Sequence, residues 1–350
     1  MSLSITPTAR TADAARIDDA CTSSSHAGST KVRALRGTHT WDLALRHSGP
    51  QRVAIRWERN GRPGAPVVVV AGGISAHRHV AANACDAGAG WWDVQVGPGR
   101  AIDPDAFDVL AIDWLGSDGA LDVVIDPSDQ ADALAAVLDA LHIARVFAFV
   151  GASYGAMVGL QFAARHPTRV SRLVAISGTH RAHPYASAWR ALQRRAVALG
   201  ALQCDDAHGV ALARQLALLS YRTPEEFDAR FGPAVVEQGR VRVDAESYLD
   251  HCGTAFAQRT SAIAYVRLSE SIDLQQIDPA LVRVPVTLVA VAEDRLVPVA
   301  DTYALAHQLR GETCVRVVRS HYGHDAFLKE PAAIDDVLRE ALAIDTAVAA

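Results

Sequence analysis

A serine between two glycines is the residue of this sequence best suited to nucleophilic chemistry. It stands in Gly151-Ala-Ser153-Tyr-Gly155, after the apolar run 146–150 and before a helical pattern over residues 155–165. A sharp strand-to-helix turn lifts such a hydroxyl above the sheet, and the flanking glycines are needed because a Cβ would clash with neighbouring backbone. The motif in this context predicts that Ser153 attacks an acyl group and carries it covalently.

A serine hydroxyl is a weak nucleophile, so Ser153 needs a base and a carboxylate that orients the base. In proteins with this turn, the chain order is serine, then acid, then histidine. That order selects Asp294, just after the apolar run 284–290, and His324, just past the run 314–318. We expect both residues at the same sheet edge as Ser153.

Each of these two loops also contains competing side chains. Glu293 is an alternative carboxylate, and His321 or Asp325 could act in place of their neighbours. Glu293 is also compatible with a solvated loop charge. His321 is the weaker histidine because it lies close before Gly323, where the backbone must turn.

Two backbone N–H groups are expected to stabilise the oxyanion of an acyl-transfer reaction. One should come from Tyr154, which follows the nucleophile, and the other from the loop Gly72-Gly73-Ile74-Ser75. Ile74 is the first choice for the second donor and Gly73 the next. The two glycines are equally compatible with an ordinary tight turn.

The elements around these residues alternate between apolar runs and helical patterns. Residues 53–57 alternate like a strand with one exposed face, whereas 67–71 and 108–113 are continuous β-branched or apolar runs, typical of buried parallel strands. Further strands are predicted at 146–150, 170–177, 284–290 and 314–318, and helices at 129–141, 155–165, 300–309 and 331–344. This pattern predicts an α/β-hydrolase fold with a doubly wound, mostly parallel sheet.

Residues 183–278 differ in composition and hydrophobic pattern from the rest of the chain. They carry long Ala, Leu, Arg and Gln stretches of helical period with no strong strand candidate, which predicts a helical lid inserted into the sheet. The core is then expected over residues 36–182 and 279–350. Residues 1–35 are rich in Ser, Thr and Ala and lack the apolar segment of a secretory signal, so we interpret them as a mobile N-terminal tail.

Composition excludes several classes of function. A net charge of −5 and a pI near 6.3 argue against nucleic acid or an anionic membrane as a partner, and no apolar run is long enough to cross a bilayer. The five cysteines are odd in number and show no metal-ligand spacing, so neither a metal site nor a disulfide framework is expected. Reduced thiols are typical of a cytoplasmic protein.

Several blocks of the sequence, taken together over residues 50–345, resemble the MetX-type homoserine O-acyltransferases of methionine biosynthesis. The blocks are Gly73-Ile-Ser-Ala-His77, Gly90-Trp-Trp92, Val96-Gly-Pro-Gly99, Gly151-Ala-Ser-Tyr-Gly-Ala-Met157, Ala191-Leu-Gln-Arg-Arg-Ala196, Ser247-Tyr-Leu249 and Gly323-His-Asp-Ala-Phe-Leu328. The chain departs from the family at the nucleophile turn, which keeps only one of two usual glycines after Tyr154, a residue that is smaller or aliphatic in the family.

The resemblance implies a ping-pong reaction in which acetyl-CoA or succinyl-CoA acylates Ser153 and L-homoserine then accepts the acyl group. It assigns the amino acid's carboxylate to Arg194 on the lid and its amino end to Asp325. It also implies a homodimer and no bound metal or organic cofactor, the acyl-CoA being a co-substrate. A serine O-acyltransferase of the same family and an esterase on the same fold are the alternatives.

Overall fold

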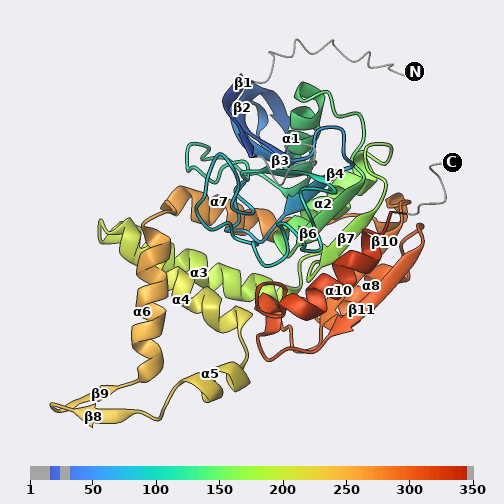
Figure 1. The fold of residues 1–350 in the computed structure, drawn as a ribbon. Helices are drawn as coiled ribbons and strands as arrows, with labels where there is room; N and C mark the ends of the chain where they lie inside the picture. Colours follow the sequence, from blue (N-terminus) through green and yellow to red (C-terminus); the bar gives the residue numbers. More distant parts are fainter. Residues whose placement is uncertain (1–15, 24–31, 345–350) are drawn as a thin grey trace, which may run out of the picture.

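A nine-stranded sheet forms the centre of the part of the chain that the structure, a computed structural model, describes: residues 16–23 and 32–344. The strand order is β1-β2-β3-β5-β4-β6-β7-β10-β11 (Figure 1). The strands are β1 (Arg16–Ser23), β2 (Val32–Leu45), β3 (Gly49–Gly61), β4 (Val67–Ala71), β5 (Asp108–Ile112), β6 (Ala148–Ala152), β7 (Leu173–Ile176), β10 (Val286–Val291) and β11 (Thr313–Val318).

The sheet is antiparallel at its first edge and parallel through the rest. Strands β1, β2, β3 and β5 pair antiparallel in that order, whereas every pair from β5 to β11 is parallel. Helices α1 (Pro127–Ala140), α2 (Tyr154–Arg165), α8 (Val299–Ala306), α9 (Ala326–Lys329) and α10 (Pro331–Ala341), with the short 3-10 helices η1 (Pro279–Leu281) and η2 (Gly323–Asp325), connect or follow these strands. The predicted doubly wound, mostly parallel sheet is confirmed.

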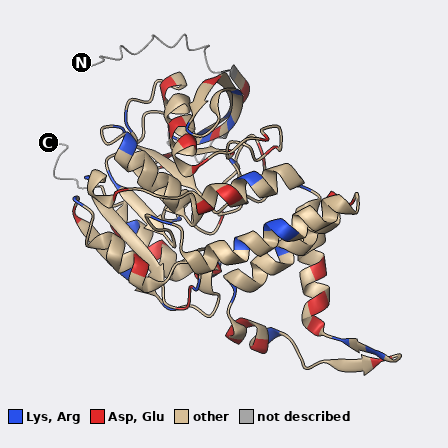
Figure 2. Ribbon diagram, turned by 180° about the vertical axis from the view of Figure 1, so that it is seen from behind, with Lys and Arg blue, Asp and Glu red and all other residues tan. Residues whose placement is uncertain are grey.

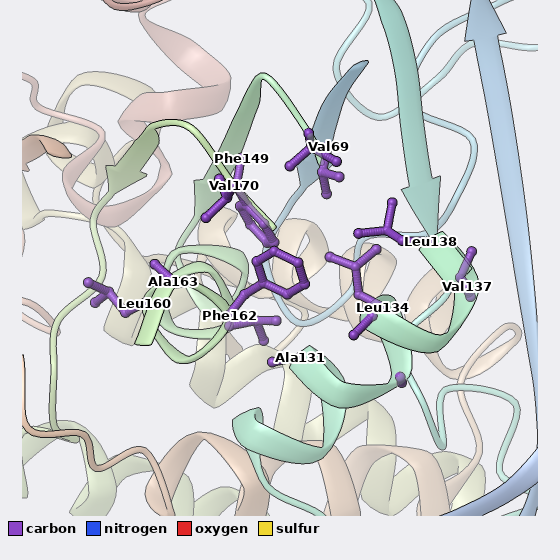
Figure 3. Close-up of a cluster of buried hydrophobic side chains, with 14 of the residues drawn as sticks. Val69, Ala131, Leu134, Val137, Leu138, Phe149, Leu160, Phe162, Ala163 and Val170 are labelled. Atoms are coloured by element: carbon purple, nitrogen blue, oxygen red, sulfur yellow. The ribbon is translucent and has the colours of Figure 1, made fainter. Parts of the chain in front are cut away.

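Two apolar cores cover the two faces of the sheet, and the parallel strands contribute to both. In β4, Val69 belongs to the core beneath α1 and α2, whereas Val68 and Val70 belong to the core beneath α10. Figure 3 shows the first core, with Phe162 among the side chains packed around Phe149. Burial of one such side chain contributes about 1.5–3 kcal/mol, so strands with two buried faces must be apolar throughout.

Helix α1 begins two residues before the predicted start because of its local sequence. Asp126 accepts hydrogen bonds from the backbone N–H groups of Ser128 and Asp129, and the Asp129 carboxylate accepts one from the Asp126 N–H in return. Pro127 follows as the first helical residue, where its missing N–H has no consequence. This reciprocal cap fixes the start of the helix.

The lid lies between β7 and β10 and consists mainly of helices. These are α3 (Pro184–Leu202), α4 (Asp206–Tyr221), α5 (Pro224–Arg230), α6 (Asp244–Ala257) and α7 (Ala262–Asp273). Helices α3 and α4 approach closely because Gly200 faces Gly209, where an added Cβ on Gly200 would lie 2.7 Å from the Gly209 nitrogen. At the root of the lid, the Ala182 N–H donates to Gln275 (3.1 Å) and the Ile277 N–H donates to His180 (3.0 Å).

The lid also contains a two-stranded hairpin that the sequence analysis did not predict. Its strands, β8 (Val235–Glu237) and β9 (Arg240–Arg242), are three residues long and fully exposed, and the hairpin projects away from the core (Figure 1). Strands this short carry too little of the alternating pattern to be recognised.

The prediction of a mobile tail over residues 1–35 is wrong for residues 16–23 and 32–35. Residues 16–23 form β1, which pairs antiparallel with the first half of β2. The remaining residues of the proposed tail lie outside the described residues. An edge strand joins a sheet through backbone hydrogen bonds, which do not depend on the periodicity of its side chains. The hydrophobic pattern of residues 1–35 therefore did not predict strand β1. No helix in the described part of the chain is long and apolar enough to cross a membrane.

Candidate active site

The turn between β6 and α2 holds Ser153 in a strained backbone conformation. Its φ is 54° and its ψ is −115°, values that side-chain-bearing residues rarely adopt. An added Cβ on Gly151 would lie 2.3 Å from the Gly155 oxygen, and one on Gly155 would lie 2.1 Å from the Ala71 oxygen. The close approach of three backbone segments therefore requires both glycines that flank the serine.

The structure brings Ser153, His324 and Asp294 together in one chain of hydrogen bonds. Ser153 Oγ lies 2.7 Å from His324 Nε2, and His324 Nδ1 lies 2.6 Å from Asp294 Oδ2. Ser153 follows β6, His324 follows β11 and Asp294 follows β10, so the three residues meet at the carboxyl edge of the parallel part of the sheet.

The electrostatics of this chain suit a general base. Burial alone would lower the pKa of His324, but the charge and hydrogen bond of Asp294 outweigh burial and raise the pKa above its ordinary value. Asp294 is itself buried, and its Oδ1 accepts hydrogen bonds from the N–H groups of Leu296 (2.8 Å) and Val297 (3.0 Å). These bonds fix which carboxylate oxygen faces the imidazole.

The competing side chains in the two loops are occupied elsewhere. The Glu293 carboxylate accepts a hydrogen bond from the Ser320 N–H (2.7 Å) and so ties the two loops together. His321 is exposed, with its ring 3.9 Å from that of Tyr322. Asp325 pairs with Arg222. The structure therefore places Asp294 and His324, and none of the three alternatives, in the hydrogen-bond chain of Ser153.

The predicted oxyanion donors flank the serine. Tyr154 is the first residue of α2, where an N–H has no acceptor within the helix. Ile74 lines the same cavity as Ser153, and a Cβ added to Gly73 would lie 3.8 Å from that of Ser153. The carbonyl of Gly73 accepts a hydrogen bond from Trp114 Nε1 (3.0 Å), which holds this loop in place.

The Gly-Trp-Trp block, singled out for its family resemblance, makes hydrogen bonds to two segments of the site. The indole N–H of Trp92 donates to the Phe327 carbonyl (3.0 Å), so the Gly-Trp-Trp block contacts the segment that carries His324. The indole N–H of Trp91 donates to the His77 carbonyl (2.9 Å), next to the Gly72–Ile74 loop. The Gly-Trp-Trp block thus fixes the relative positions of the base and the oxyanion loop.

A cavity opens above the serine, between the sheet edge and the lid. Its lining includes Ser153, His324, Met157, Leu296 and Val297 from the core, together with residues of α3, α4 and α7. A second, larger cavity adjoins it and shares Ile74, Arg190, Gln193, Tyr221 and Ile272 with it. The two together provide a chamber for a small acceptor and a wider approach to it.

Comparisons with known proteins place this arrangement in a family. A homoserine O-succinyltransferase from Xanthomonas campestris pv. campestris is 59% identical over 310 residues, which cover 88% of this chain and 84% of that protein. The chain belongs to the homoserine O-acyltransferase family. A homoserine O-acetyltransferase of this family, from Thermus thermophilus, is 34% identical over 285 residues, 71% of each chain.

The family model of the α/β-hydrolase fold matches residues 66–331, which confirms the predicted fold class. A crystal structure of homoserine O-acetyltransferase from Bacillus anthracis superimposes with a TM-score of 0.80, covering 89% of this chain and 98% of that one. At 18% identity, this likeness concerns the fold alone.

The family resemblance assigns two substrate contacts, and in the structure each of these residues forms an ion pair and lines neither cavity. Arg194 donates to Ser269 Oγ (2.9 Å) and pairs with Asp273 (2.8 Å), and it is absent from the lining of both cavities. Asp325 pairs with Arg222, whose Nε lies 3.1 Å from its carboxylate. The roles of Arg194 and Asp325 stay predictions.

Sequence reasoning missed two arginines near the site. Arg190 lines both cavities, one helical turn before Arg194. Arg222 bridges Asp325 and Glu226 just after α4. The available signal for Arg190 was its spacing, because residues four apart share a face of a helix and Arg190 therefore lies on the same face of α3 as Arg194.

Proposed function

We propose that this protein transfers an acyl group from an acyl-CoA to the side-chain hydroxyl of L-homoserine, through a covalent acyl-Ser153 intermediate. The observation that supports it best is the unbroken chain from Ser153 Oγ through the His324 imidazole to the buried Asp294. The family relatives, which are named for homoserine O-succinyl and O-acetyl transfer, supply the substrate class.

In the first half-reaction, His324 Nε2 takes the proton of Ser153 as Oγ attacks the thioester carbonyl carbon. The oxyanion that forms is stabilised by the N–H groups of Tyr154 and Ile74. As the tetrahedral intermediate collapses, the carbon–sulfur bond breaks and CoA leaves as the thiol, with the proton that His324 returns. The acyl group remains as an ester on Ser153.

In the second half-reaction, homoserine takes the place of CoA. His324 accepts the proton of its hydroxyl, the oxygen attacks the Ser153 ester, and the intermediate collapses to the O-acyl amino acid. The proton on His324 then returns to Ser153 Oγ. The cavity under the lid favours transfer over hydrolysis, because water excluded from the acyl-enzyme cannot compete with the acceptor.

The proposal extends to the state of the protein in the cell. We infer a cytoplasmic homodimer that needs no bound metal or organic cofactor. The apolar side chains exposed on the lid, such as Leu202 (81% exposed) and Val236 (75%), support contact with a second copy. The five cysteines are free thiols, as expected in a reducing compartment.

The test measures free CoA thiol while acetyl-CoA or succinyl-CoA is offered with homoserine or with serine. We expect parallel lines in double-reciprocal plots, loss of turnover in Ser153→Ala, and labelling of wild-type Ser153 by a fluorophosphonate. Intersecting lines from a ternary complex would contradict the covalent intermediate. Ester hydrolysis without acceleration by homoserine would instead indicate an esterase, and preference for serine would change the acceptor.

A further inference from the structure

The cavity at Ser153 contains one permanent charge. Among the described residues that line it, Arg190 is the only lysine, arginine, aspartate or glutamate. The rest of the lining combines apolar side chains, such as Met157 and Ile272, with uncharged polar groups and histidines. The Arg190 side chain is only 11% exposed, so its charge is weakly screened by solvent.

The charge of Arg190 is only partly neutralised by its neighbours. Its Nε lies 2.6 Å from Asp273 Oδ1, but the other oxygen of the same carboxylate pairs with Arg194 at 2.8 Å. One carboxylate thus serves two guanidinium groups, and the cluster keeps a net charge of plus one. In Figure 2, blue and red segments are likewise interspersed along the lid helices.

The guanidinium also retains hydrogen-bonding capacity. Arg190 Nε is bound to Asp273 and Nη2 donates to Ser187 Oγ at 3.2 Å. Nη1 makes no hydrogen bond to any residue in the part of the chain that the structure describes. A half-neutralised arginine with a free N–H group in a cavity that holds no other charged lysine, arginine, aspartate or glutamate among the described residues is a site for a carboxylate.

We propose that Arg190 binds the terminal carboxylate of a dicarboxylic acyl group carried on Ser153, and so selects succinyl-CoA over acetyl-CoA. The inference rests on the proposed function. In a succinyl group, the two carboxyl carbons are separated by three C–C bonds, about 4 Å, so both ends of the acyl group fit within one small cavity. Such a buried carboxylate would be strongly unfavourable without a cation beside it.

The other arginines of the chamber are less well placed for this role. Arg56, Arg214 and Arg259 line the second cavity and not the one that contains Ser153. The ring centroid of Tyr221 lies 5.6 Å from the guanidinium carbon of Arg214 and 5.8 Å from the centroid of the His324 imidazole. The family relative named a homoserine O-succinyltransferase, at 59% identity, agrees with a succinyl donor.

The test uses the first half-reaction alone, because homoserine then plays no part. Wild-type protein and Arg190→Gln are mixed with succinyl-CoA or acetyl-CoA, and the burst of thiol and the mass of the acyl-Ser153 protein are recorded. We expect Arg190→Gln to acylate about a hundredfold more slowly with succinyl-CoA, as is typical when one partner of a buried charge pair is removed. Acylation by acetyl-CoA should be unchanged or faster.

Two further variants control for structure. Arg190→Lys keeps the charge and should recover part of the succinyl rate. Arg195→Gln removes a charge from an exposed position on the same helix and should leave both rates unchanged. Acylation of Arg190→Gln by acetyl-CoA also shows that the variant is folded.

The outcomes separate this inference from the proposed function. Equal loss with both donors, or an unchanged donor preference, would overturn the role of Arg190 while leaving acyl transfer intact. If wild-type Ser153 is acylated by neither donor, the proposed function fails and the inference fails with it.

Discussion

Replacing Asp294 with asparagine removes one charge from the buried hydrogen-bond chain with almost no change in shape. The outcome depends on which way the new amide faces. Its oxygen must occupy the Oδ1 position, because the N–H groups of Leu296 and Val297 point there. The amide NH₂ therefore faces His324 Nδ1, where the carboxylate oxygen stood 2.6 Å away.

The NH₂ group forces the imidazole into the opposite tautomer. His324 Nδ1 must accept a hydrogen bond, so its proton moves to Nε2, which faces Ser153 Oγ. A protonated Nε2 cannot take the proton of the serine. The same change of tautomer in serine hydrolases lowers kcat on the order of 10⁴-fold, or about 5.5 kcal/mol of transition-state stabilisation.

Thiol release with the acyl-CoA donor measures this loss directly, and thermal unfolding checks that the variant folds. Glu293→Gln is the matched control, since it removes the neighbouring charge while its amide oxygen can still accept from Ser320. The control should stay within about twofold of wild type. If Asp294→Asn keeps more than a tenth of the activity while Glu293→Gln loses it, the assignment of the acid is wrong.

Two further predictions follow from the same region. Asp294 raises the pKa of His324 above its ordinary value of 6.5, and the imidazole acts as a base only when it is neutral. We therefore expect kcat/KM for the acyl-CoA to decrease as the pH is lowered, with its midpoint above pH 6.5. A midpoint at or below pH 6.5 would contradict the electrostatic argument. Tyr154→Phe should lower the free energy of unfolding in urea by about 1–3 kcal/mol, because the buried Tyr154 hydroxyl lies 2.6 Å from Ser271 Oγ and its removal leaves that hydroxyl without a partner. Tyr154→Phe with unchanged stability would show that the bond contributes nothing.

The sequence was sufficient to predict those site residues that directly follow the ends of strands. A parallel strand buried on both faces must be apolar throughout, so the ends of β6, β10 and β11 are visible in the pattern. Ser153, Asp294 and His324 follow those ends within a few residues, and chain order selected the two loops that hold the acid and the histidine. The choice of Asp294 over Glu293 and of His324 over His321 came from the hydrogen bonds of the structure. Their meeting at one edge follows from the parallel topology.

Features that depend on helix rotation or on backbone pairing could not be predicted in this way. Arg190 and Arg194 are one turn apart on α3, and only the packing of the lid on the sheet decides which of them lines the cavity. Strand β1 joins the sheet edge through main-chain hydrogen bonds, for which composition gives no signal.

The backbone hydrogen bonds at the root of the lid have a consequence for how this architecture can change. They join residues 180–182 to residues 275–277, so the polypeptide leaves the sheet and returns to it at one point. The loop-closure entropy of the intervening segment grows only with the logarithm of its length. The projecting hairpin can therefore lengthen, shorten or be cleaved at its turn during evolution or engineering without pulling apart β7 and β10, on which the catalytic geometry depends.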